Sequence, residues 1–231
     1  MTTRSDSVAL AAIPADIEAL RGPLIDIALK LRLPLSVDQT ELLLGFLVLL
    51  RRWTATYNLT AVREPAAMLS QHVADCLAVI EPLRRQLPGS VPRRVLDVGS
   101  GGGLPGVVIA VMCPDMEIVC VDAVGKKAAF IRQVAAQLAL PKLRGEHARV
   151  EVMEEGAFDV VASRAFASLN DFVNLTRRHL APDGVWMAMK GKVPEVELAA
   201  LPADVAVFHV EQLHVPGLDA ERHLVWMLPK R

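Results

Sequence analysis

The fold class is decided by the segment Asp97-Val98-Gly99-Ser100-Gly101-Gly102-Gly103-Leu104-Pro105-Gly106. It follows a short apolar run that is typical of a strand, 94–98, and leads into an apolar run that is typical of a helix, 104–113. Glycines at such a junction permit positive φ and let a ligand approach the backbone, and the helix N-terminus directs N–H groups at it. A tight turn alone also needs glycine, but four glycines at positions 99–103 favour a bound ligand.

Two ligands fit this loop in two different frames. The frame Gly101-x-Gly103-x-x-Gly106 matches a dinucleotide fingerprint, and Asp122 lies 19 residues beyond Gly103. The frame that starts at Asp97 instead puts a carboxylate at the end of the strand, where it would repel a pyrophosphate and attract an ammonium group. S-adenosylmethionine carries an ammonium group and a sulfonium centre and has no phosphate. Asp122 can accept hydrogen bonds from ribose hydroxyls in either case.

Strand and helix patterns alternate after the loop. Strands are predicted over 94–98, 117–121, 158–162 and 185–189, and helices over 104–113, 126–140 and 169–180. This alternation predicts a mostly parallel sheet covered by helices on both faces. The tail differs, because 206–215 and 223–228 are strand-like and only a short turn at Pro216 and Gly217 separates them. An antiparallel C-terminal hairpin is predicted there, and it favours a class I methyltransferase over a dinucleotide enzyme.

The first part of the chain is predicted to be helical. Ser36-x-x-Gln39 is a capping-box pattern ahead of the apolar stretch 42–53, and apolar residues recur at helical spacing from Met68 to Ile80, up to Pro82. The stretch 84–94 is rich in proline and arginine and is predicted to be a linker. We therefore expect an N-terminal helical extension, 1–90, packed on a Rossmann-like core, 91–231, as one compact unit.

Composition sets limits on function. The 231 residues are 52% hydrophobic and 22% charged, as in a globular protein. The net charge of −1 does not favour nucleic-acid binding, so such a role would need basic residues gathered on one face.

The longest apolar run, 42–50, is far shorter than the roughly 20 residues that span a bilayer, so no membrane helix is expected. Cys76, Cys113 and Cys120 lack metal-site spacing and suggest free thiols in a reducing cytoplasm, with no metal.

Several motifs together resemble one known family. They are NLTAVREP (58–65), HVADCL (72–77), the loop GSGGGLPG (99–106), VDAVGKKAAFIRQVA (121–135), SRAFASL (163–169), MKG (189–191) and GLDAERHLVWM (217–227). From about Leu42 onward, the chain resembles the bacterial 16S ribosomal RNA guanine-N7 methyltransferase G family, also called glucose-inhibited division protein B. Cys76 stands where that family more often has serine. The resemblance implies a Rossmann-like S-adenosylmethionine-dependent methyltransferase that modifies N7 of a specific guanine in 16S rRNA, in the 530-loop hairpin, and releases S-adenosylhomocysteine.

The resemblance also implies site residues. It places S-adenosylmethionine against Gly99, Leu104 and Asp122, against Val150 and Glu151 near the adenine, and against Arg164. Val150 could instead be a core residue and Glu151 a solvated charge. Arg164 is also the candidate catalytic residue, because the carboxyl ends of the strands are where ligands lie in open α/β sheets. The full set of predicted cofactor residues is Asp97, Gly99, Gly101, Leu104, Asp122, Val150, Glu151 and Arg164.

The expected chemistry needs no general base. Guanine N7 is a neutral nucleophile with an in-plane lone pair, and it loses no proton when it attacks a methyl group. Catalysis then depends on alignment and on electrostatic control of the moving charge. Between Phe158 and Leu169 there is no NPPY-like motif and no proline–cysteine pair of the kinds that other nucleic-acid methyltransferases use. Phe166 could stack on a flipped base or could be a core residue.

RNA contacts would come from local basic residues. The candidates are Arg63, His72, Lys126, Lys127, Arg132, Arg144, Lys190 and Lys192. Each lysine could equally be an ordinary surface charge, and His72 could be a core histidine. The expected partner is 16S rRNA or the small ribosomal subunit, met by a cytoplasmic monomer with no obligate protein partner. The alternatives are a methyltransferase for a small molecule or protein, an NAD-binding protein, and a non-enzymatic ribosome-assembly factor.

Overall fold

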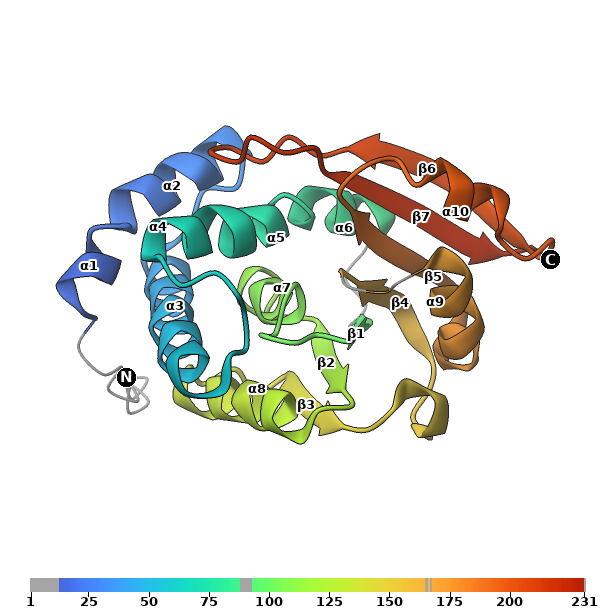
Figure 1. Ribbon diagram of the computed structural model, residues 1–231, viewed down its shortest axis with the longest axis horizontal. Coiled ribbons are helices and arrows are strands. Elements are labelled where there is room, and N and C mark those ends of the chain that lie inside the picture. Colours follow the sequence, from blue (N-terminus) through green and yellow to red (C-terminus); the bar gives the residue numbers. More distant parts are fainter. Residues whose placement is uncertain (1–12, 88–92, 165, 167, 231) are drawn as a thin grey trace, which may run out of the picture.

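A seven-stranded sheet forms the centre of the computed structural model, which describes residues 13–87, 93–164, 166 and 168–230 (Figure 1). The strand order is β3-β2-β1-β4-β5-β7-β6. The first five strands in this order pair in parallel, and β7 pairs antiparallel with both β5 and β6. The strands are β1 Arg94–Val98, β2 Glu117–Asp122, β3 Leu143–His147, β4 Phe158–Ser163, β5 Leu180–Lys190, β6 Val205–Gln212 and β7 His223–Pro229. The predicted α/β class and its antiparallel hairpin are confirmed.

Helices cover both faces of the sheet. The α-helices are α1 Ala15–Glu18, α2 Arg21–Lys30, α3 Val37–Tyr57, α4 Pro65–Met68, α5 Asp75–Leu77, α6 Ile80–Gln86, α7 Gly106–Met112, α8 Gly125–Gln137, α9 Leu169–Thr176 and α10 Glu195–Ala199. A π-helix, Leu69–Ala74, joins α4 to α5, and 3₁₀ turns occupy Val150–Val152 and Arg177–His179. Each face of the sheet packs against its own hydrophobic core. Val95 of β1 lies in one core and Leu96 in the other, because neighbouring side chains of a strand point to opposite faces.

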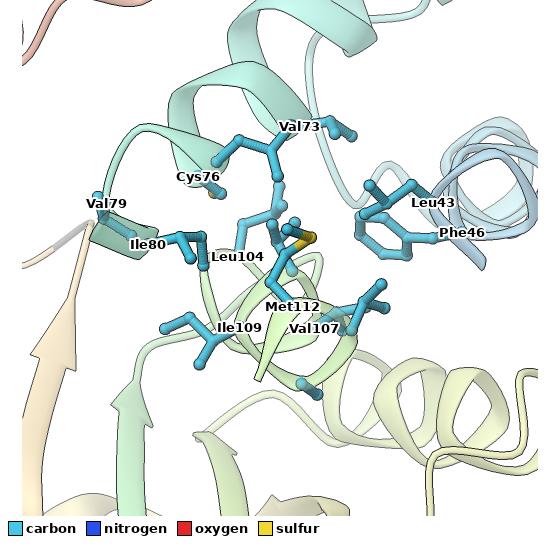
Figure 2. Packing of buried hydrophobic residues seen from close by; sticks show 14 of the residues in the cluster. Leu43, Phe46, Val73, Cys76, Val79, Ile80, Leu104, Val107, Ile109 and Met112 are labelled. Carbon is cyan, nitrogen blue, oxygen red and sulfur yellow. The ribbon is translucent and has the colours of Figure 1, made fainter. Parts of the chain in front are cut away.

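The N-terminal helices share a core with the sheet. Figure 2 shows side chains of α3, of the 65–86 helices and of α7 meeting, among them Phe46, Val73 and Val107, which are fully buried. Ser36 caps α3, since its hydroxyl accepts from the N–H of Gln39 and the Gln39 side chain accepts from the N–H of Ser36. The predicted capping box is therefore confirmed. This packing brings Leu59 and Thr60, in the loop after α3, beside the glycine loop, with which they line a hollow.

The structure corrects several predicted elements. Strand β3 was not predicted, because LRGEH is a short edge strand with few apolar residues. Helix α10 was not predicted either, and none of its residues is buried. The predicted linker 84–94 begins too early, since α6 continues to Gln86 through Pro82, which its first turn accommodates. Strand β1 starts at Arg94, as predicted. Residues 88–92 lie outside the described part.

Three further observations concern the described residues. None of their helices is both long enough and apolar enough to span a membrane. They contain no group of three or more His, Cys, Asp or Glu side chains arranged to hold a metal ion. Cys76, Cys113 and Cys120 are buried and free, as the sequence predicts.

Candidate cofactor and substrate site

The glycine loop lines a hollow at the carboxyl ends of the strands. Gly99, Gly101 and Gly103 have φ of +68°, +56° and +78°, which favour glycine. The hollow measures about 210 Å³ and is lined by Leu50, Leu59, Thr60, Gly99, Ser100, Gly101, Gly102, Leu104, Lys127 and Arg164. A Cβ at Gly99 would meet nothing within 4 Å, whereas one at Gly103 would lie 2.5 Å from Val107 Cγ2. The open space therefore lies over the start of the loop.

Asp122 fixes this loop to the end of β2. Its side chain is 6% exposed, and its carboxylate accepts from the N–H of Gly101 at 3.0 Å and from the N–H of Val124 at 2.8 Å. Lys127, near the start of α8, places Nζ 3.6 Å from the same carboxylate. The structure thus gives Asp122 a role in shaping the loop, and its contact with a ribose stays a prediction.

Asp97 lies beneath the loop and does not line the hollow. It is fully buried, and its Oδ2 accepts from the N–H of Gly106 at 2.9 Å. Its Oδ1 is buried and has no hydrogen-bond partner in the described part of the chain. Burial raises the pKa of Asp97 to about 7, although the Gly106 N–H and nearby Arg164 favour the charged form. Its predicted contact with an ammonium group is not tested by this arrangement.

A second hollow of about 390 Å³ adjoins the first, and Arg164 lines both. Its other lining residues are Gln71, His72, Asp75, Met189, Lys190, Gly191 and Arg222. The carboxylate of Asp75 is buried, with 3% of its side chain exposed, and it binds two arginines. Arg222 Nε lies 2.8 Å from Oδ1, and Arg164 Nη1 lies 3.4 Å from Oδ2.

The π-helix supplies further contacts to this second hollow. Arg164 Nη1 also donates to the carbonyl of Gln71 at 3.3 Å. His72 is 6% exposed, and its Nε2 lies 2.8 Å from Oγ1 of Thr60, a residue that lines the first hollow. Burial and the charge of Arg164 lower the pKa of His72, which keeps the imidazole neutral near pH 7. Thr60 and His72 thus link the two hollows, as Arg164 does.

The two predicted lysines at the end of β5 lie in different places. Lys190 lines the second hollow. Its Nζ donates to Oε2 of Glu197 at 2.7 Å and to the carbonyl of Phe166 at 3.4 Å. Lys192 is exposed and lines a separate, open depression beside residues 212–221. Phe166 packs on Phe172, with ring centroids 5.3 Å apart.

The remaining predicted residues do not line either hollow. Val150 is buried in the core beside α9, and its carbonyl accepts from His179 Nε2; Glu151, next to it, is exposed. Both follow β3 at the same sheet edge as Asp122. The other basic candidates lie on the surface: Lys126 is exposed, Arg63 donates to Asn58, Arg132 donates to the carbonyl of Gly145, and Arg144 pairs with Glu117, Glu146 and Glu155.

Sequence reasoning missed Thr60, Asp75 and Arg222. All three lie inside motifs that carried the family resemblance, but none was singled out. Asp75 had a usable signal, because a carboxylate flanked by apolar residues of a buried helix needs a cationic partner. The identity of that partner, 147 residues away for Arg222, is set only by the fold.

Comparison with known proteins settles the family. The family model GidB, described as rRNA small subunit methyltransferase G, matches residues 39–225. The chain belongs to this family. A relative from Leptothrix cholodnii, named ribosomal RNA small subunit methyltransferase G, is 61% identical over 91% of this chain and 96% of its own. One of the same name from Methylibium petroleiphilum is 58% identical over 93% and 96%. The resemblance inferred from the motifs is confirmed.

Solved structures agree with the fold. TrmN from Thermus thermophilus has a TM-score of 0.52 at 21% identity, covering 71% of this chain and 53% of that chain. A SAM-dependent methyltransferase from Aquifex aeolicus has a TM-score of 0.51 at 14% identity, covering 70% and 92%. These structural similarities show that the chain has the class I methyltransferase fold.

Proposed function

We propose that the chain transfers a methyl group from S-adenosylmethionine to N7 of a specific guanine in 16S rRNA, in the 530-loop hairpin. It belongs to a family whose members are named for methylation of small-subunit rRNA. The observation that carries the proposal is Arg164, which lines both hollows. A methyl donor in the first hollow and an acceptor nucleotide held at the second would meet beside its guanidinium group. We further propose a cytoplasmic monomer that acts on 16S rRNA or the small subunit.

The first hollow suits S-adenosylmethionine, whose bound form supplies a methyl group on a sulfonium centre. The open space over Gly99 is a cradle that any side chain would fill. Gly101 and Leu104 would contact the ligand, Asp122 would face the ribose hydroxyls, and Val150 and Glu151 would flank the adenine. The buried Oδ1 of Asp97 has no hydrogen-bond partner among the described residues, and it would accept from the ammonium end. No phosphate-binding role is needed for any of these residues.

The acceptor side supports a reaction without a general base. Asp75 is held by two arginines, and His72 is buried and linked to Thr60. The charge of Asp75 is already matched by the arginines, and the lowered pKa of His72 makes its imidazole a weak base. The residues beside the reacting atoms would therefore orient the base and balance charge as it moves from sulfur to the ring. Arg164 is the group best placed to touch the base, since it reaches both hollows.

Transfer of a tritiated methyl group tests the proposal. The acceptor is small-subunit RNA from a strain that lacks the enzyme, given either as naked RNA or as intact subunits, and the product is digested to nucleosides. We expect 7-methylguanosine as the one labelled nucleoside, at one site. A labelled protein or small molecule, or a different methylated nucleoside, would replace this function with another. Calorimetry should give binding of S-adenosylhomocysteine and none of NADH.

A further inference from the structure

The side chains around the second hollow carry a net positive charge. Three cationic side chains line it, from Arg164, Lys190 and Arg222. Two carboxylates neutralise part of this charge, Asp75 against both arginines and Glu197 against Lys190. His72 is neutral, since burial and Arg164 lower its pKa. One net positive charge remains at the mouth of the S-adenosylmethionine hollow.

The arginines are fixed and still able to donate. Asp75 engages Nη1 of Arg164 and Nε of Arg222, and backbone carbonyls of Gln71 and Glu221 take further bonds from the Nη1 groups. Among the described residues, no hydrogen bond involves Nη2 of either arginine. The side chains are 27% and 24% exposed. Two held guanidinium groups, whose Nη2 atoms bind none of the described residues, form a good receptor for a tetrahedral oxyanion.

We propose that this second hollow binds one backbone phosphodiester of the RNA substrate, with Arg222 and Arg164 as its ligands and Asp75 as the residue that positions both. Arginine binds guanine through the acceptors O6 and N7, but N7 must stay free here to attack the methyl group. A phosphodiester presents acceptors only and suits a pair of guanidinium groups. The inference rests on the proposed function, because it takes the ligand to be RNA. A bound phosphate would fix the nucleotide beside the S-adenosylmethionine hollow.

Binding of RNA by Arg222→Gln tests this directly. The buried carboxylate of Asp75 keeps Arg164 as its cationic partner in this variant, and the glutamine amide can still donate to it. The probe is unmethylated small-subunit RNA, titrated between 50 and 200 mM salt. We expect affinity about fivefold weaker near 0.15 M salt and a log–log salt slope reduced by roughly 0.7–0.9, the effect of one lost phosphate contact. Arg222→Lys should restore much of both, because lysine binds phosphate as a point charge. S-adenosylhomocysteine affinity should not change.

Arg177→Gln is the matched control. Arg177 is a partly exposed arginine paired with Asp204 at the opposite edge of the sheet, where β5 and β6 begin, and its loss should leave RNA binding unchanged. Asp75→Asn tests the positioning role. In this variant KM for RNA should rise, and the log–log salt slope of RNA binding should become smaller, while the thermal unfolding temperature stays the same. Should Arg222→Gln bind RNA with wild-type affinity and slope, the phosphate site is wrong. If wild-type protein binds RNA but forms no 7-methylguanosine, the proposed function fails while the phosphate site stands.

Discussion

The two adjoining hollows are built from different parts of the polypeptide. Half of the residues that line the first hollow, proposed to hold S-adenosylmethionine, come from the short segment 99–104. Glycines at 99, 101 and 103 in this loop adopt positive φ. Four charged side chains line the second hollow, and among them Asp75 meets arginines that lie 89 and 147 residues away along the chain. Ligand binding at the first hollow should therefore be lost when a side chain is added to a glycine. Ligand binding at the second hollow should be weakened when a charged side chain is removed.

The largest expected effect comes from adding a side chain to the backbone-built hollow. Gly99→Asp should abolish measurable binding of S-adenosylhomocysteine in calorimetry, because the new carboxylate would fill the space open over Gly99. Gly217→Asp is the matched control, since Gly217 also has positive φ, +79°, and open space around it but lies in the turn before β7. It should carry the same backbone strain and keep cofactor affinity. Equal affinity in the Gly99 variant would place the cofactor elsewhere.

A smaller effect is expected when the support of the loop is removed. Asp122→Ala deletes the acceptor for the N–H groups of Gly101 and Val124 as well as the proposed ribose contact. The free energy of cofactor binding should become less favourable by about 1.5–3 kcal/mol. Asp122→Asn keeps one oxygen acceptor and should lose less. A dissociation constant unchanged in the alanine variant would show that neither contact supports cofactor binding.

Arg164 belongs to both hollows, so its loss distinguishes turnover from binding. Arg164→Ala should lower the turnover rate at saturating RNA roughly tenfold, because the guanidinium group no longer orients the reacting base. Arg222→Gln should act mainly on KM for RNA. If Arg164→Ala changed KM alone, Arg164 would be a phosphate ligand with no role at the reacting atoms.

These two hollows also differ in how far the sequence predicts them. The glycine loop is contiguous, so its strand–loop–helix context and its positive φ values follow from local residue types, and β1 was predicted at 94–98 as found. The ion-paired cluster depends on which helix packs against which strand end, so Asp75 and Arg222 were not identified as partners. Strand β3 was missed for a related reason, because an edge strand with alternating exposure needs few apolar residues.

The methyl-transfer step itself should depend little on pH. If N7 attacks without losing a proton, the rate constant with both substrates bound should be flat between roughly pH 6.5 and 8.5. Single-turnover kinetics over this range measure it. A tenfold rise per pH unit would indicate a general base. An inflection near pH 7 that disappears in Asp97→Asn would instead come from the buried carboxyl beneath the loop.

The last expected effect is on stability, and it also concerns Asp97. Burial raises the pKa of Asp97 from 3.8 to about 7, so between these values the folded protein holds a proton that the unfolded chain has released. The free energy of unfolding therefore loses a contribution as pH rises from about 4 to 7, and the loss is complete above 7. Asp97→Asn keeps an acceptor for Gly106 and cannot ionise, so its stability relative to wild type should rise over this range. Urea unfolding at a series of pH values measures the difference, with Asp204→Asn, an exposed carboxylate, as control. A difference that stays constant from pH 4 to 8 would mean that Asp97 is already ionised in the folded protein at pH 5, with its charge met by the Gly106 N–H and by Arg164.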